Sequence, residues 1–271
     1  MNTEAFSSTG SVFETSLSSD LVQARAPAIF APGADERTGR HYAFISTQRV
    51  MDALRDVGFR PVDARQSATR KASPMHARHL VRLRRQYESI ALRDAVPEIV
   101  MLNSHDGRMA YQLRFGLYRA VCTNGLIVST GCLGCIRVSH RGNVLEELVR
   151  SAVQMAEGFG YLAERVEKME RRELEEAARL RFAAEALELR HPDAANAGMQ
   201  PSQLLITHRP EDIGDDVWRT YNVIQENLLG GGLARRVNGG RLTRSRRISS
   251  IPENVRLNTG LWDLAERALA A

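Results

Sequence analysis

The sequence predicts an α+β protein: a helix followed by a curved antiparallel β-sheet, then a long helix or helix pair, and C-terminal helices with an Arg-rich loop. Three observations favour this class. Short stretches of alternating apolar and polar residues fill the region from about residue 60 to 138. Asp106-Gly107 and Asn124-Gly125 supply the backbone positions that tight hairpin turns require. Apolar residues at helical spacing dominate from about residue 143 to 190.

Four regions are expected along the chain. Residues 1–40 are rich in Ser, Thr, Ala and Pro and predict a mostly disordered arm, with an apolar island at 26–31. Residues 41–142 should form an α+β core with an antiparallel sheet. Residues 143–200 should form an acidic helical segment. Residues 201–271 should contribute C-terminal helices and a basic loop that pack on the core.

The core is expected to open with a helix that Ser46 or Thr47 caps and Gly58 ends. Residues 60–67 predict a strand. In residues 77–87, His79, Val81 and Leu83 alternate with arginines, which predicts a half-buried antiparallel strand with a basic outer face. Further strands are expected over residues 98–102, 109–121, 126–128 and 136–138, with Tyr111, Leu113, Phe115 and Leu117 on one face of the second of these.

The rest of the chain reads as helical. One apolar face runs through Leu148, Ala152 and Met155, and the long pattern is expected to break near Arg172. A helix over residues 217–229 should begin after Asp215 or Asp216 and stop at the glycines of 230–232. A last helix is predicted over residues 259–270.

Composition limits the class of protein. The chain has 271 residues and is 43% hydrophobic, which is ample for a globular core. Its apolar runs are too short to span a bilayer, and no secretory signal is visible near the start, so we expect no membrane partner. Three cysteines, an odd number, favour a reducing, cytoplasmic setting over a disulfide framework. No cofactor is predicted.

The positive charge is almost entirely arginine. The formal net charge is +5, and only Lys71 and Lys168 are lysines. Arginine-rich codon usage explains this without any function. A functional explanation is that guanidinium groups suit bidentate phosphate contacts and stacking on bases. The two explanations are compatible.

Nucleic-acid binding is the first candidate activity. The stretch 60–87 contains eight basic residues against one acid, and the stretch 235–247 contains six arginines and no acid. Such segments can follow a phosphate backbone, and tyrosines beside them can stack on bases. The alternative is a solvated strand face and a disordered loop. The candidate contact residues are Arg78, Arg82, Arg84, Arg85, Tyr87, Tyr118, Arg235, Arg236, Arg241, Arg244, Arg246 and Arg247.

A metal site and a catalytic site are weaker candidates. Cys132 and Cys135 form a C-x-x-C pair, and with Cys122 and His140 they make four potential zinc ligands. Redox chemistry or plain buried thiols are the alternatives. His105 and Asp106 are candidate acid–base partners, with Cys122 as a nucleophile. Adjacent side chains of an extended chain point to opposite faces, however, and Asp106 is equally explained by turn chemistry.

Eight segments of the chain together form a specific set of motifs: Arg40 to Thr47, Val57-Gly58-Phe59, His79 to Arg84, Asn103 to Gly107, Arg119 to Gly125, Ile136 to His140, Trp218 to Gly232 and Leu261 to Glu266. Through these segments the chain resembles the phage/plasmid-like proteins of domain of unknown function 932, from about Ala26 to the C-terminus. The match departs from the family pattern at 207–209, where paired arginines are more usual. The resemblance implies a gene of phage, plasmid or genomic-island origin. The order of elements is also similar to that of single-strand annealing proteins.

The sequence therefore favours, over an enzyme, a DNA-binding protein of a mobile element that binds, anneals or protects single-stranded DNA. Two alternatives remain open. One is a thiol- or zinc-dependent enzyme acting through His105, Asp106 and Cys122. The other is a homo-oligomeric protein that binds a host factor, for instance through the glutamate-rich helix of 164–188.

Overall fold

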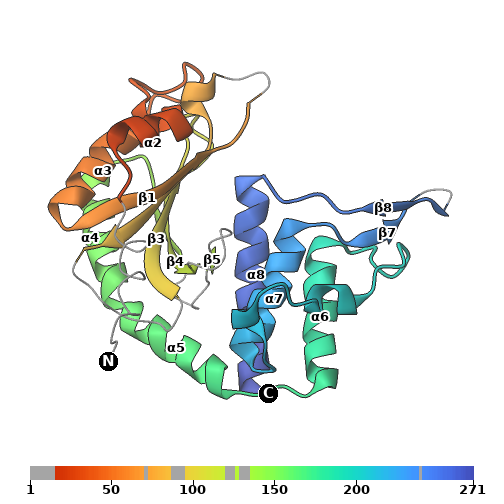
Figure 1. The fold of residues 1–271 in the computed structure, drawn as a ribbon. Coiled ribbons are helices and arrows are strands. Elements are labelled where there is room, and N and C mark those ends of the chain that lie inside the picture. Colours follow the sequence, from red (N-terminus) through yellow and green to blue (C-terminus); the bar gives the residue numbers. More distant parts are fainter. Residues whose placement is uncertain (1–15, 70–72, 87–94, 120–125, 128–134, 238–239) are drawn as a thin grey trace, which may run out of the picture. The chain divides into compact units, whose positions relative to one another are not determined.

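A computed structural model describes residues 16–69, 73–86, 95–119, 126–127, 135–237 and 240–271 (Figure 1). The chain forms two compact units. The first comprises Met1–Ala120 and Thr130–Gly160, and the second comprises Val121–Ser129 and Tyr161–Ala271. Both helices and an antiparallel sheet are present, with further helices after the sheet, so the predicted α+β class is confirmed.

The first unit contains an antiparallel sheet and helices that precede and follow it. Its helices are α2 (Ser19–Arg25), α3 (Thr47–Asp56) and α4 (Val144–Glu157), with 3-10 turns η1 (Pro27–Phe30) and η2 (Pro74–His76). Its strands are β1 (Phe59–Gln66), β2 (His79–Arg85), β3 (Ala95–Asn103), β4 (Tyr111–Arg119) and β6 (Cys135–Val138). The strands pair in the order β1-β2-β3-β4, and β6 also pairs with β4. Pro61 lies on β1, at the sheet edge, where its missing N–H is tolerated.

The register of the sheet places the predicted apolar residues on one face. Val81 pairs with Met101, and Met101 pairs with Leu113. His79, Val81 and Leu83 share a face, as predicted, and so do Tyr111, Leu113, Phe115 and Leu117. The register shows that both sets lie on the same face of the sheet, and all seven residues are buried. Buried residues of α3 (Val50, Met51, Leu54) and of α4 (Leu148, Ala152, Met155) complete this core.

The other face of β2 differs from the sequence prediction. Arg82 and Arg84 were expected on a solvated basic face, but they are only 4% and 8% exposed. Glu98, on β3, accepts a hydrogen bond from Arg82 Nη1 at 2.8 Å and from Arg84 Nε at 2.7 Å. The guanidinium of Arg84 also lies 4.4 Å from the ring centroid of Tyr118. Because their charges are compensated by a buried carboxylate, these two arginines do not form an exposed basic strip.

The segment before residue 41 is more ordered than the sequence suggests. Within its described part, residues 16–40, Ser18 caps α2 by accepting a hydrogen bond from Leu21 N at 3.3 Å. Val22, Ala28 and Ile29 are fully buried. The apolar island thus packs into the first unit, and the predicted arm of residues 1–40 is not mostly disordered over this range.

The second unit is mainly helical. It contains most of α5 (Phe159–Arg171), then α6 (Glu176–Arg190), α7 (Val217–Gly230) and α8 (Ile251–Ala270), with 3-10 turns η4 (Pro201–Leu205) and η5 (Pro210–Asp212). Its strands are β5 (Leu126–Ile127), β7 (Ala234–Arg236) and β8 (Leu242–Arg244). Trp218 and Tyr221 of α7 and Trp262 of α8 are buried, and their rings contact one another. None of the helices in the described part of the chain is long and apolar enough to cross a membrane.

Two helix boundaries differ from the sequence prediction. The predicted break near Arg172 is present, since α5 ends at Arg171, but a second break occurs at Gly158. A Cβ on Gly158 would lie 2.9 Å from Cζ of Phe115, so the close packing of α4 on the sheet explains a glycine here. The last helix begins at Ile251, eight positions before the predicted start at 259. Pro252 lies in its first turn, where a missing N–H costs nothing.

Candidate nucleic-acid interface

The arginine-rich stretch of the second unit forms a β-hairpin. Strands β7 and β8 are antiparallel, with Ala234 opposite Arg244, Arg235 opposite Thr243, and Arg236 opposite Leu242. We use the name arginine hairpin for residues 232–247, whose described residues include no acid. The sequence predicts an Arg-rich loop here, whereas the structure shows two paired strands that carry several of its arginines.

Most arginines of the hairpin face solvent. Arg236, Arg241, Arg244, Arg246 and Arg247 are exposed, and Arg235 is half-buried. Leu242 lies among them with 68% of its surface exposed. Arg235 forms a long ion pair of 3.9 Å with Asp193. The hairpin thus presents several positive charges around one exposed apolar side chain.

The hairpin is anchored at its base by a glycine and an arginine. Gly231 ends α7 with φ +78°, and a Cβ there would lie 2.6 Å from the carbonyl carbon of Arg246. The guanidinium of Arg190 donates to the carbonyl oxygens of Leu228 and Arg246. Burial lowers the pKa of Arg190, and Arg235 lowers it less. Gly231 and Arg190 therefore hold the end of α7 against the segment that follows β8.

Replacing Gly231 with alanine should weaken this anchor. The backbone conformation is one that only glycine adopts readily, and the added methyl would meet the backbone of Arg246, so a loss of roughly 1–3 kcal/mol is expected. Urea unfolding measures this loss, and trypsin cleavage at the hairpin arginines should become faster. Gly230→Ala is the matched control, because Gly230 is helical and has open space around its Cβ position. Equal stability of the two variants would contradict the anchor.

A second polar cluster lies at one end of the sheet in the first unit. His79 is opposite Asn103, Leu102 is opposite Gln112, and Tyr111 is opposite Val138. The start of β2, the end of β3, the start of β4 and the end of β6 consequently meet at the same end. There, His79, Asn103, His105 and Tyr111 are almost fully buried, and His140 is 6% exposed.

Thr47, the first residue of α3, connects this cluster. Its hydroxyl lies 2.7 Å from His79 Nε2, and Asn103 Nδ2 donates to it at 3.3 Å. His79 Nδ1 lies 2.9 Å from the carbonyl oxygen of Ala77, which can only accept. Nδ1 must therefore carry the proton, and the Thr47 hydroxyl donates to Nε2. Asn103 Oδ1 accepts from His140 Nε2 at 3.0 Å.

The histidines of this cluster are neutral at physiological pH. Burial lowers the pKa of His79 to about 4 and, together with the neighbouring histidines, that of His105 to about 3. Burial also lowers the pKa of His140 and raises the pKa of Tyr111. His105 Nδ1 has no hydrogen-bond partner among the described residues. These side chains form a buried, uncharged hydrogen-bonded network.

Comparison with known proteins places the chain in a family. The sequence model of the protein family "Domain of unknown function (DUF932)" matches residues 36–262. The chain belongs to this family. It is 36% identical to the UPF0380 proteins YafZ and YfjQ of Escherichia coli (strain K12), each over 245 residues that cover 90% of this chain and 88% of the relative. No solved structure matches the chain.

In this DUF932 chain the predicted contact residues fall in both units. Arg78 is exposed just before β2, Arg85 is half-buried at its end, and Tyr118 is half-buried against Arg84. Tyr87 lies outside the described residues. The hairpin arginines belong to the second unit. The hairpin is therefore the densest group of exposed predicted residues, and β2 contributes fewer than expected.

The structure describes only some residues of the two weaker candidate sites of the DUF932 chain. Asp106 accepts from Ser104 Oγ at 2.6 Å and from Arg108 N at 3.1 Å, which is turn chemistry, while His105 faces Thr47. Cys122 and Cys132 lie outside the described residues. Cys135 is half-buried and lies 3.9 Å from Gln112 Oε1. Among the residues that the structure describes, no three His, Cys, Asp or Glu side chains are grouped to hold a metal.

Sequence reasoning missed three residues that organise these sites. The sequence places Thr47 at a helix start, Glu98 at a strand start and Tyr111 on the apolar face of a strand, and it links none of them to these sites. The Tyr111 hydroxyl donates to the carbonyl oxygen of Ile45 at 2.9 Å. The available signal was the isolated polar residue within each apolar pattern, because a buried polar group requires a partner.

Proposed function

We propose that the protein binds DNA through the arginine hairpin, with single-stranded DNA as the preferred form. The observation that carries this proposal is the group of exposed arginines on a hairpin whose described residues include no acid. Guanidinium groups bind phosphate oxygens with two parallel hydrogen bonds, and several of them on one ribbon suit a repeating polyanion.

Leu242 supports the preference for single strands. Its exposed side chain lies opposite Arg236 and gives an apolar surface beside the phosphate-binding groups. Unstacked bases offer apolar faces that can pack on such a surface, whereas the bases of a duplex are stacked on each other. Annealing or protecting strands of a phage, plasmid or genomic island is the process that this proposal favours.

A triple substitution tests the proposal. Arg236→Gln, Arg241→Gln and Arg246→Gln remove three charges but keep Arg244, which donates to the carbonyl oxygen of Gly232 at 2.8 Å. Fluorescence anisotropy of a labelled single-stranded oligonucleotide, measured over a salt series, should show weaker binding. The slope of log affinity against log salt should fall by about 2, because each lost phosphate contact contributes about 0.7.

The control removes the same charge elsewhere. Arg49, Arg171 and Arg267 are exposed and lie outside the hairpin, and their replacement by glutamine should leave the slope nearly unchanged. Equal losses in both triple variants would mean that net charge, not the hairpin, drives binding. Absence of binding at low salt would refute the proposal, and tighter binding of duplex would refute the preference for single strands.

A further inference from the structure

The first unit contains a pocket of about 430 Å³ at the end of the sheet where the buried polar network lies. Its size is within the range of small-molecule sites. The register explains why Arg108 and Arg141 both line the pocket. Tyr111 on β4 is opposite Val138 on β6. Arg108 lies three residues before Tyr111, and Arg141 lies three residues after Val138, so both arginines fall at this end of the sheet. The polar residues that line it are His41, Tyr42, Arg108, Ser139, His140 and Arg141.

The pocket is positively charged, and its arginines are available. None of its lining residues is an acid. Arg108 and Arg141 are exposed, and neither guanidinium forms a hydrogen bond or ion pair with any residue that the structure describes. The nearest acid along the chain, Asp106, is already engaged by Ser104 and by the backbone of Arg108. Two unpaired guanidiniums in a recess suit a ligand with two negative charges.

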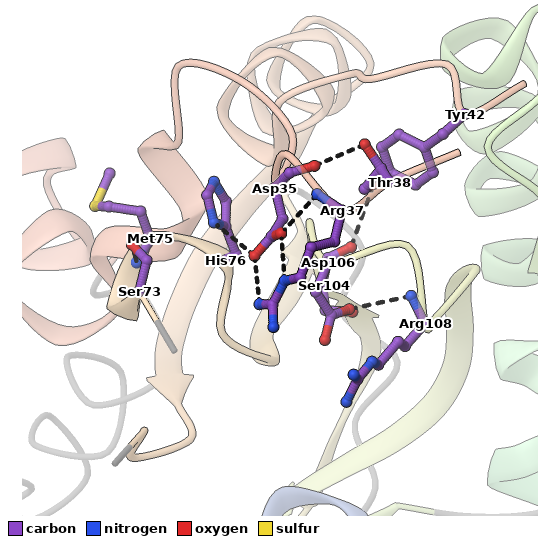
Figure 2. Close-up of polar contacts among 10 residues, drawn as sticks. All are labelled: Asp35, Arg37, Thr38, Tyr42, Ser73, Met75, His76, Ser104, Asp106 and Arg108. Carbon is purple, nitrogen blue, oxygen red and sulfur yellow. Dashed lines mark hydrogen bonds and ion pairs between the residues drawn. The ribbon is translucent and has the colours of Figure 1, made fainter. Parts of the chain in front are cut away.

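The rim of the pocket is fixed by a polar network on the other side of the same loop (Figure 2). The carboxylate of Asp35 accepts from Arg37 N at 3.0 Å and from Arg37 Nε at 2.8 Å, and Asp35 N donates to the carbonyl oxygen of His105 at 2.9 Å. Thr38 then lies against Gly107, whose Cβ position would be 3.2 Å from Thr38 Cγ2 at a φ of +74°. These contacts connect the loop that carries Arg108 to residues 35–38.

The inner wall of the pocket is aromatic. The rings of Tyr42 and His140 stack with centroids 4.4 Å apart, and the Tyr42 hydroxyl lies 3.4 Å from the carbonyl oxygen of Ser104. Burial raises the pKa of Tyr42, so its hydroxyl stays protonated. This wall offers a neutral surface to an organic group beside the two arginines.

We propose that this pocket binds a small phosphate monoester, with Arg108 and Arg141 on the phosphate and the Tyr42 wall on the organic part. The site lies in the first unit, whereas the arginine hairpin lies in the second, so this inference is independent of DNA binding by the hairpin.

Isothermal titration of the full chain tests this inference with two probes, inorganic phosphate and adenosine 5′-monophosphate, at constant ionic strength set with sodium chloride. The monophosphate should bind saturably and more tightly than phosphate. Arg108→Gln and Arg141→Gln together should weaken it by about a hundredfold, since one charged hydrogen-bonding partner contributes about tenfold. Arg49→Gln with Arg137→Gln, which removes two exposed arginines outside the pocket, should bind like the unaltered chain.

Three other results would overturn the inference. Equal affinity for both probes would identify free phosphate rather than an ester as the ligand. Unsaturable binding of both, or equal affinity of the double variant and the unaltered chain, would mean that the pocket is not an anion site. The hairpin triple variant separates the two proposals, because it should lose DNA and keep the monophosphate.

Discussion

Replacing Glu98 with glutamine is expected to lower the free energy of unfolding of the first unit by about 3–5 kcal/mol, because it removes the charge of a buried carboxylate that accepts hydrogen bonds from two buried arginines. Glu98 is fully buried, and the side chains of Arg82 and Arg84 are only 5% and 10% exposed. Glutamine keeps the shape and one acceptor oxygen of glutamate. The loss therefore reports the charge rather than a cavity.

The two units allow this loss to be located. Trp218 and Trp262 both lie in the second unit, so tryptophan fluorescence in urea reports on that unit and should change little. Hydrogen exchange of the β3 amides reports on the first unit and should become faster. Glu157→Gln is the control, since Glu157 is exposed at the end of α4. A loss below about 1 kcal/mol would place the pairs with ordinary surface ion pairs and contradict the argument.

A double-mutant cycle adds a second criterion. Arg82→Met alone should also destabilise the first unit, because it leaves Glu98 with one fewer donor. The loss of stability measured for the Arg82→Met, Glu98→Gln double variant should be smaller than the sum of the losses of the two single variants. The second substitution removes a group that has already lost its partner. Additive losses would indicate that the two side chains do not interact.

The Glu98 contacts also show which part of the sheet could be predicted from sequence. Alternation is local, so His79, Val81 and Leu83 were correctly placed on one face with period two. Whether the opposite face is solvated depends on residues of another strand. Glu98 is 14 positions from Arg84, and no local pattern links them. Alternating arginines in a strand therefore predict which side chains share a face of the sheet, but not whether that face is exposed to solvent.

Helix ends could be predicted from local residues such as glycine and proline. Gly58 and the glycines of 230–232 were predicted as helix stops, and α3 and α7 end within one or two residues of them. The Ser250-Ile251-Pro252 start of α8 is an equally local signal that was overlooked. Asn238-Gly239 is a common hairpin signal, yet the flanking strands are short and rich in arginine, which conceals them from a hydrophobic pattern.

The polar network was the least predictable feature, because three strands, one helix and two loops build it from residues far apart in sequence. Thr47 and Tyr111 are 64 positions apart and their hydroxyl oxygens lie 3.2 Å from each other. Sequence reasoning named His105 and His140 as separate candidates for catalysis and for metal binding. The structure brings them into a single neutral network, in which their common property is burial.

That burial predicts a strong loss of stability in weak acid. The pKa of His79 is lowered to about 4 and that of His105 to about 3, from an ordinary value of 6.5. Below pH 6.5 the unfolded chain takes up protons at these histidines and the folded chain does not, so acid favours unfolding. The full stability is present above pH 6.5 and is lost as the pH falls toward these lowered values. At about pH 5 the loss should be roughly 2 kcal/mol for each histidine.

Hydrogen exchange and urea unfolding between about pH 7.5 and 5 measure this loss, in a range above the ordinary pKa of carboxylates. His79→Gln should be less stable at neutral pH, because the hydrogen bonds to Thr47 and Ala77 change. The slope of its free energy of unfolding against pH should be smaller, because unfolding takes up about one proton fewer. His41→Gln is the control, since it removes an exposed histidine outside the buried network. If the His79→Gln variant and the unaltered chain lose stability in parallel, His79 is not held neutral by the fold.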